Sequence, residues 1–140
     1  MAYTALLTID DLGEEYENVP VFHCEFEFNR KIDIQTGHSM SAAQAGLIQL
    51  VVDSTKSTLI LDWLLRQEEK DGKIVFLGDG QVGSTGSKKI VFEKAKCVNY
   101  RETFEATSSD AMRCHFSLWC LCIDVAGSKY EVYWDKKYNQ

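Results

Sequence analysis

Hydrophobic and polar residues alternate over long stretches of this chain, which is the pattern of β-strands buried on one face. The clearest stretch is Val19–Ile32, where Phe22, Cys24, Phe26 and Phe28 share one side of the predicted strand. Further strands are predicted, on similar grounds, at Ala2–Ile9, Ala45–Asp53, Lys73–Leu77, Lys88–Ala106, Met112–Val125 and Lys129–Trp134. Because Lys88–Ala106 is long enough for either one strand or two, the pattern predicts about seven or eight strands.

One segment, Ser54–Glu69, follows the helical period instead. Serine and threonine residues at its start are suited to capping, and a charged run before Gly72 marks its end. A single helix of about 12 residues is marginal in water, so its apolar face must be buried against the strands. We expect the helix to pack through Leu61, Trp63, Leu64 and Leu65. The predicted fold is therefore mainly β: a compact antiparallel β-barrel or sandwich with one flanking α-helix.

The composition is that of an ordinary globular domain. The 140 residues are 45% hydrophobic and 26% charged, and we expect residues 1–140 to form one domain. The formal net charge of −6 argues against binding to nucleic acid, since no basic stripe offsets the acidic surface. The N-terminal sequence has no basic region, and its apolar run is too short for a signal peptide or a membrane span. These features predict a protein that folds in the cytoplasm without membrane insertion.

Five cysteines invite a search for metal or catalytic chemistry. No C-x-x-C pair occurs, and reduced, buried thiols are the default expectation. A zinc site can be drawn from Cys114, His115, Cys120 and Cys122, but adjacent residues of a strand point to opposite faces. The same geometry keeps His115 from activating Cys114 as a nucleophile, which leaves a cysteine enzyme as a weak alternative. We therefore predict no metal, no cofactor and no catalytic residue.

A glycine-rich stretch at residues 78–89 raises the alternative of nucleotide binding. Gly78, Gly80 and Gly83 spell G-x-G-x-x-G after a predicted strand, and Glu102 lies near the spacing of a ribose-binding carboxylate. That motif requires a helix next, because the helix N-terminus binds the pyrophosphate. Here the chain continues with the strand pattern of Lys88–Ala106, so we predict a hairpin loop instead.

Two regions are suited to contacts with other proteins. Asp33–Gln44 has no periodicity, and a loop of about a dozen residues is long for a compact domain. Met112–Val125, by contrast, is apolar on both faces, which indicates a strand that is covered twice. One predicted face carries Cys114, Phe116, Leu118, Cys120 and Cys122, and the other carries His115, Ser117, Trp119, Leu121 and Ile123. The candidate subunit interface consists of Trp119, Leu121 and Ile123.

The order and spacing of several motifs resemble the haemolysin-coregulated protein family, Hcp or TssD. The first half is similar through CEFEFN at Cys24–Asn29, AGLIQL at Ala45–Leu50 and LDW at Leu61–Trp63, with Lys31, Asp33 and Gly37 in the loop. The second half is similar through GKIVF at Gly72–Phe76 and I-x-F-x-x-A-x-C-x-x-Y at Ile90–Tyr100, followed by Phe104 and Met112. Each motif alone is ordinary strand sequence, so the specificity lies in their order along most of the chain.

The resemblance implies a structural subunit of the inner tube of a type VI secretion system. Such subunits are compact β-barrels that form hexameric rings, and the rings stack into a hollow tube that a contractile sheath drives outward. The partners implied are further copies of the chain or related tube subunits, the sheath, a VgrG-type spike, the baseplate and effector proteins. The subunit would assemble in the cytoplasm and then be secreted without a signal peptide.

By the same resemblance, the long loop reaches the neighbouring ring. Its candidate ring-stacking residues are Asp33, Gly37, His38, Ser39, Met40 and Gln44. A small-molecule carrier is the alternative function, since Phe26, Phe116 and Trp119 could line a cavity inside the same barrel. The native mass separates the two functions, because a carrier is expected to be a monomer and a tube protein a ring.

Overall fold

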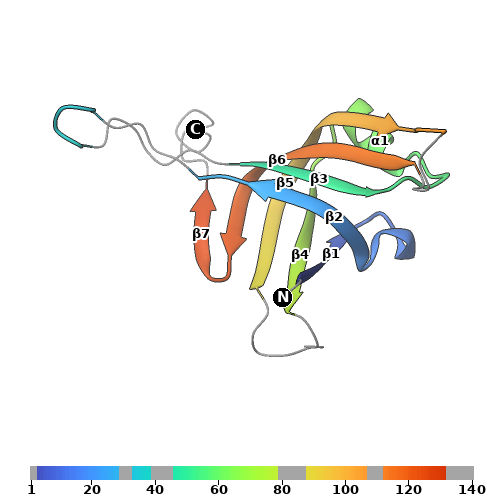
Figure 1. Cartoon of the computed structure of the whole chain (residues 1–140), viewed down its shortest axis with the longest axis horizontal. Helices are drawn as coiled ribbons and strands as arrows, with labels where there is room; N and C mark the ends of the chain where they lie inside the picture. Colours follow the sequence, from blue (N-terminus) through green and yellow to red (C-terminus); the bar gives the residue numbers. More distant parts are fainter. Residues whose placement is uncertain (1–2, 29–32, 39–45, 79–87, 107–111, 132–140) are drawn as a thin grey trace.

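The computed structural model describes residues 3–28, 33–38, 46–78, 88–106 and 112–131 of the chain. These residues form seven β-strands, one α-helix and one short 3₁₀ helix (Figure 1). The elements are β1 (Tyr3–Ile9), the 3₁₀ helix η1 (Glu14–Tyr16), β2 (Val19–Phe26), β3 (Leu47–Asp53), α1 (Leu59–Leu65), β4 (Lys70–Gly78), β5 (Lys88–Thr103), β6 (Arg113–Val125) and β7 (Ser128–Glu131). The predicted mainly β fold with one helix is confirmed, and β5 is one long strand rather than two.

The strands close into an antiparallel barrel. Neighbouring strands follow the order β3-β2-β1-β4-β5-β6-β7, and β3 also pairs with β6, which closes a ring of six strands. The long β6 serves two partners along one edge, because its residues 113–119 pair with β3 and its residues 122–125 pair with β7. Closure gives hydrogen-bond partners to strands that would otherwise be edges. β7 pairs only with β6, so it lies outside the closed ring and continues the sheet along that strand (Figure 1).

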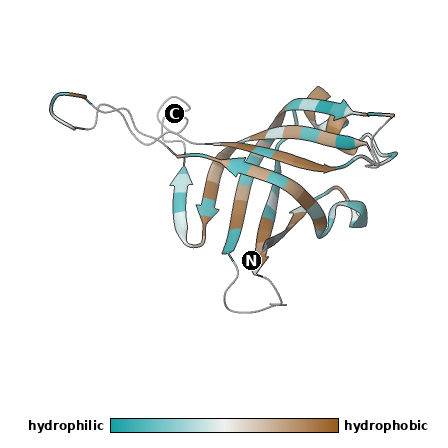
Figure 2. Ribbon diagram, viewed as in Figure 1, coloured by the Kyte–Doolittle hydropathy of each residue, from teal (hydrophilic) through white to brown (hydrophobic). Residues whose placement is uncertain are grey.

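The alternation of the sequence sorts side chains between the barrel core and the outer surface. Figure 2 shows hydrophobic residues recurring along the strands that form the barrel. The largest fully buried side chains are Leu7, Ile9, Ile48, Leu50, Trp63, Ile74, Ile90, Phe92, Phe116, Leu118, Cys120 and Ile123. No polar or charged side chain is buried in the part of the chain that the structure describes. The interior of the barrel is thus an apolar core, and its packing fixes the strands whose other sides form the outer surface.

β2 departs from the alternation read in the sequence. Its pairing with β3 shifts between Val21 and His23, which is the effect of a β-bulge. Phe22 lies at this shift and is 52% exposed, whereas Cys24 and Phe26 pack against the core. The expected burial of Phe22 with the other aromatic residues of β2 is therefore wrong.

The helix is shorter than predicted. The sequence pattern predicts Ser54–Glu69, whereas α1 spans the seven residues Leu59–Leu65. The residues before α1 form a connector, in which the Ser54 amide donates a hydrogen bond to the Met112 carbonyl at 3.0 Å. After α1, Gln67 has a φ of 55°, in the left-handed region that ends helices. The polar ends of the predicted helix are therefore connecting segments.

A helix of two turns buries only a narrow side. Trp63 is fully buried, and Leu64 is half-buried against the core. Leu61 is also half-buried. The predicted packing of Leu65 is wrong, because its side chain is 65% exposed.

β5 and β6 bend together, and the bend changes which residues of β6 face the core. Across the bend, residues of the main core cluster are three positions apart instead of two: Phe92 and Ala95 in β5, Cys120 and Ile123 in β6, although Cys122 is also buried, with 9% of its surface exposed. Between the first pair, Lys94 has a φ of 52°. Ile123 is consequently 1% exposed and pairs with Phe92 in the core. The prediction of Ile123 as an outer interface residue is wrong.

Candidate assembly surfaces

The turn at residues 33–38 is the described part of the loop that we expect to stack rings. Asp33 organises this turn: its Oδ1 accepts a hydrogen bond from the Gln35 amide at 2.9 Å, and its carbonyl accepts one from the Gly37 amide at 2.7 Å. The Asp33 amide donates to the His38 carbonyl at 2.8 Å. Gly37 has a φ of 75°, which glycine adopts without strain. Asp33, Gly37 and His38 are thus brought together, while Ser39, Met40 and Gln44 lie outside the described residues.

Ile34 is the apolar residue of this turn, and sequence reasoning missed it. Its side chain is 94% exposed, and in Figure 1 the turn stands away from the barrel. The hydrogen bonds within the turn fix its backbone without help from the barrel. Such a turn presents Ile34 to whatever lies beyond the subunit. A large aliphatic residue within a polar loop was the signal in the sequence.

The outer face of β2, β3, β6 and β5 is one four-stranded surface, which we call the outer sheet face. The strand register sets its side chains in rows: first His23, Val51, His115 and Arg101, then Glu25, Gln49, Ser117 and Asn99, then Leu47, Trp119 and Lys96. The first two rows are mainly polar, and the third row is mainly apolar.

Trp119 and Leu121 are the two predicted interface residues that reach the outer surface, where both are half-buried. Leu47 lies directly opposite Trp119 on β3 and is 42% exposed. Gly46 lets the chain pass close to the indole, since a Cβ there would lie 3.3 Å from its Nε1. The Gly46 carbonyl accepts a hydrogen bond from the Cys120 amide at 2.7 Å, which fixes this approach. Leu47 therefore extends the predicted apolar surface of β6.

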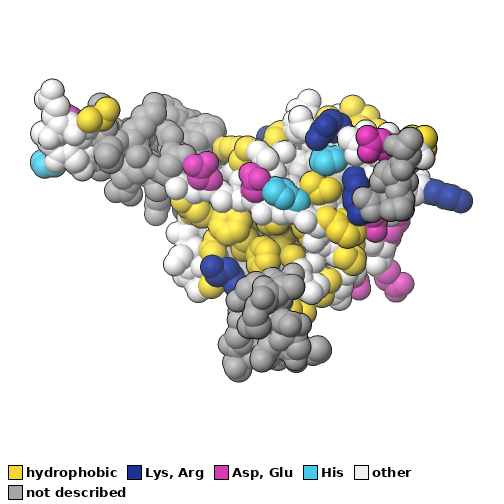
Figure 3. Space-filling model, in the orientation of Figure 1, with side chains coloured by type: hydrophobic (Ala, Val, Ile, Leu, Met, Phe, Trp, Pro, Cys, Tyr) yellow, Lys and Arg dark blue, Asp and Glu magenta, His cyan; other side chains and the backbone are white. Residues whose placement is uncertain are grey.

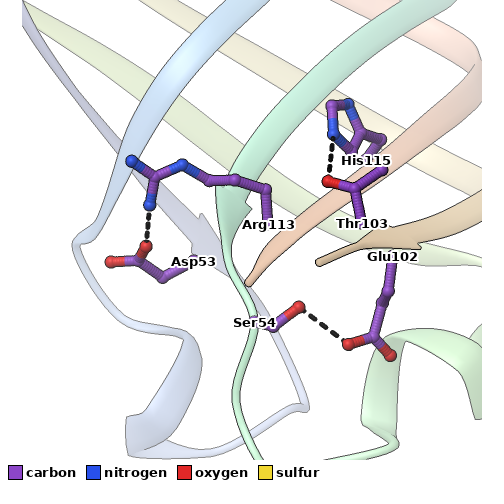
Figure 4. Close-up of polar contacts among 6 residues, drawn as sticks. All are labelled: Asp53, Ser54, Glu102, Thr103, Arg113 and His115. Carbon is purple, nitrogen blue, oxygen red and sulfur yellow. Dashed lines mark hydrogen bonds and ion pairs between the residues drawn. The ribbon is translucent and has the colours of Figure 1, made fainter. Parts of the chain in front are cut away.

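Polar contacts tie together one end of the outer sheet face (Figure 4). Arg113 forms an ion pair with Asp53 on the neighbouring β3, and its guanidinium lies 3.9 Å from the centre of the Phe22 ring. On the other side of β6, His115 Nε2 lies within hydrogen-bonding distance of Thr103 Oγ1, at 3.3 Å. These contacts connect β2, β3, β6 and β5 side by side.

Glu102 is held as an anion near the same end. The Tyr100 hydroxyl donates to Glu102 Oε1 at 2.5 Å, and the Ser54 hydroxyl donates to Oε2 at 2.7 Å (Figure 4 shows the second contact). These two hydrogen bonds, with that from Tyr100 the stronger influence, lower the pKa of Glu102. Burial and the hydrogen bond to Glu102 raise the pKa of Tyr100. At neutral pH the carboxylate is charged and the phenol neutral, so the network links β5 to the connector before α1.

Burial keeps the thiols of the described residues in their neutral form. Burial raises the pKa of Cys24, Cys97 and Cys114 to about 11 and that of Cys120 to about 12. A neutral thiol is a poor nucleophile and a poor metal ligand. Within the described ranges, no group of three or more His, Cys, Asp and Glu side chains could hold a metal ion.

None of the helices formed by the described residues is long and apolar enough to cross a membrane.

The residues expected to line a carrier cavity do not meet. Phe116 is 2% exposed in the core, whereas Trp119 lies on the opposite face of the same strand. Phe26 instead lines an open groove of about 540 Å³ together with Phe28 and Tyr130. The rings of Phe28 and Tyr130 meet edge to face at 5.6 Å between centroids. The predicted cavity of Phe26, Phe116 and Trp119 is therefore wrong.

The described residues thus form a closed antiparallel β-barrel with one short helix and with exposed apolar side chains on its outer surface. The particular family follows from the sequence: the family model described as Hemolysin coregulated protein Hcp (TssD) matches residues 1–135. The chain belongs to the Hcp (TssD) family, and it is a tube subunit of the type VI secretion system. No curated protein shows significant sequence similarity to it.

Solved structures share the fold. Hcp1 from Flavobacterium johnsoniae has a TM-score of 0.79 at 22% identity, covering 92% of this chain and 99% of that chain. Hcp1 from Salmonella typhimurium has a TM-score of 0.69 at 12% identity, covering 89% and 86%. The sheath-tube complex of an extracellular contractile injection system, PVC, includes a chain with a TM-score of 0.57 at 18% identity, covering 94% and 91%. The fold is thus shared with two proteins named Hcp1 and with a chain of a contractile sheath-tube complex.

Proposed function

We propose that this chain forms hexameric rings that stack head to tail into the type VI secretion tube, with residues 1–140 acting as one tube domain. The match of the Hcp (TssD) family over residues 1–135 carries this proposal. A heterologous interface that closes on itself makes a ring, and a second one between ring faces makes an open stack. One small chain therefore needs two different contact surfaces.

Two surfaces of the subunit support this requirement. Leu47 and Trp119 of the outer sheet face, together with Leu121 further along β6, are candidates for contacts between subunits. The turn at residues 33–38, with Ile34 exposed, is a candidate for contacts between rings. The stacking contact would also involve Ser39, Met40 and Gln44 of the same loop.

The partners follow from a role in a contractile apparatus. The likeness to the PVC sheath-tube complex supports a contractile sheath around the tube. By this proposal the chain is assembled in the cytoplasm, meets the baseplate and a VgrG-type spike, and leaves the cell with effector proteins. It acts by assembly, and no residue of the chain performs catalysis.

The native mass of the purified protein tests the proposal. Light scattering and native mass spectrometry at moderate salt are expected to give about 95 kDa, six times the 15.9 kDa of one chain. A monomer across the accessible concentration range would contradict a homohexamer. Recovery of the ring on co-expression with a related tube subunit would then support a mixed ring.

A further inference from the structure

The open groove between the end of β2 and the hairpin of β6 and β7, which we call the aromatic groove, has a volume of about 540 Å³. Phe26, Phe28 and Tyr130 line it, with ring centroids 6.4 Å apart in the first pair and 5.6 Å apart in the second. Figure 3 shows hydrophobic side chains gathered on this face, between the places of β7 and β2 in Figure 1. Phe28 is 41% exposed, so a further apolar side chain that covered this row would stabilise the fold.

The chain leaves β7 at the rim of this groove. Glu131, the last residue of β7, pairs with Cys122, so an antiparallel continuation would set residue 133 opposite Cys120. The amide of Cys120 already donates a hydrogen bond to the carbonyl of Gly46 at 2.7 Å. Because the edge of β6 is occupied there, the chain cannot follow β6 beyond this point. It departs next to Tyr130, whose ring lies against Phe28 of the groove.

The segment that follows β7 carries side chains suited to the groove. Residues 132–140 have the sequence VYWDKKYNQ, and they lie outside the described residues together with the last part of the predicted strand Lys129–Trp134. Trp134 comes three residues after Glu131, a separation of at most about 10 Å along an extended chain. An indole buries a large apolar area while its N–H stays at a wet rim. Asp135 comes next, and Lys88 gives the lining of the groove a positive charge.

We propose that residues 132–140 fold back into the aromatic groove of their own chain, with the indole of Trp134 packed against Phe28 and Tyr130. The segment is tethered at the rim, so its effective concentration at the groove is far higher than that of a separate partner. Docking removes Phe28 from water and places Asp135 near the ammonium group of Lys88. The inference concerns a contact within one chain and does not depend on ring assembly.

Disulfide trapping on the full chain, with oxidised glutathione as the oxidant, tests this contact. Lys88→Cys combined with Asp135→Cys places one thiol on the groove lining and the other next to Trp134. The native thiols are buried and neutral, so they react slowly. Lys56→Cys combined with Asp135→Cys is the matched control, since Lys56 is an exposed lysine in the connector before α1. We expect a bond within one chain that forms at least about tenfold faster in the first pair.

Trp134→Ala added to the first pair is expected to slow the bond at least about fivefold, because the indole no longer holds the segment in the groove. Non-reducing gels and mass spectrometry separate bonds within a chain from bonds between chains. Bonds between chains would assign the groove to the segment of a neighbouring copy and overturn the proposal. Equal rates in the two pairs, or a rate that Trp134→Ala leaves unchanged, would also overturn it. The native mass is recorded on the same samples, and a monomer that forms the internal bond contradicts only the ring.

Discussion

Gly72 lies where β1, β4 and β5 come together, and its missing side chain allows that approach. A Cβ at this position would lie 2.5 Å from Cζ of Phe92 and 2.5 Å from the carbonyl oxygen of Thr8. We expect Gly72→Ala to lower the free energy of unfolding by about 1–3 kcal/mol, the usual cost of overpacking. Urea unfolding measures the loss. Lys73→Ala, at the next position, is the control and is expected to change it by about 0.5 kcal/mol or less. An unchanged midpoint for Gly72→Ala would mean that the strands separate at little cost.

Glu102 gives the stability of the subunit a dependence on acidic pH. Its pKa is lowered in the folded chain by the hydroxyls of Tyr100 and Ser54, so its contribution is complete above the unfolded pKa of 4.5. That contribution is lost as the pH falls through the lower folded pKa. We expect Glu102→Gln to show a smaller difference in melting temperature between pH 7 and pH 3.5 than the wild type. Glu105→Gln, just beyond the same strand, is the control. Parallel pH profiles for wild type and Glu102→Gln would show that the hydrogen bonds contribute nothing.

At the scale of elements, α1 depends for its stability on the contacts of one side chain, Trp63. A helix of seven residues is far too short to be stable alone. The indole Nε1 of Trp63 donates to the carbonyl oxygens of Glu68 at 2.8 Å and Ala95 at 3.1 Å, which ties the end of the helix to β5. The apolar ring is fully buried at the same time. Trp63 thus satisfies backbone acceptors of two elements while filling the core.

Leu64 and Leu65 form a matched pair for testing which side of α1 is buried. Leu64 packs against the core, whereas Leu65 is 65% exposed. We expect Leu64→Asp to lower the free energy of unfolding by about 2–4 kcal/mol, because an unpaired carboxylate is placed among apolar groups. Leu65→Asp is expected to change it by less than about 1 kcal/mol in the isolated subunit. Thermal or urea unfolding distinguishes the two, and equal losses would show that the buried side is assigned wrongly.

The sequence predicted where the strands and the helix lie better than it predicted which of their residues are buried. Alternation indicated the strands, because a half-buried strand needs a period of two. It failed for Phe22 and Ile123, since a bulge and a bend shift the period there. Lys94, at the bend, has a φ of 52°, which a lysine does not signal. The length of α1 also could not be predicted, because serine and threonine residues suited to a helix cap serve equally well in a connector.

At the scale of the whole molecule, the sequence was more informative about the family than about the contact surfaces. The order of motifs indicated the Hcp family, which the family match over residues 1–135 confirms. The contact surfaces depend on which side chains remain outside after the barrel has closed. Leu47 and Ile34 are exposed and lie on the surfaces that we propose for assembly. Ile34 stands out in the sequence as a large aliphatic residue in a polar loop, whereas the exposure of Leu47 became visible only with the register of β3 and β6.

Ile34 offers a test of ring stacking that leaves the barrel unchanged. It is 94% exposed in a turn whose backbone is fixed by Asp33, so a substitution there removes no packing within the subunit. If the turn contacts a neighbouring ring, Ile34→Asp places a charge in that contact, and we expect stacking to weaken at least about tenfold. Gln35→Asp is the matched control, since it adds the same charge at the adjacent exposed position. The expected result is an unchanged melting temperature in both variants, with loss of stacks only for Ile34→Asp.

Sedimentation velocity and electron microscopy, at concentrations where the wild type forms stacks, measure this effect. Rings should persist in Ile34→Asp, because ring closure and stacking use different surfaces of the subunit. Stacks as abundant as those of the wild type would remove the turn from the stacking contact. Loss of rings together with stacks would instead place Ile34 at the contact within the ring. The two results separate the roles of the turn and of the outer sheet face, because only the second surface carries Trp119 and Leu47.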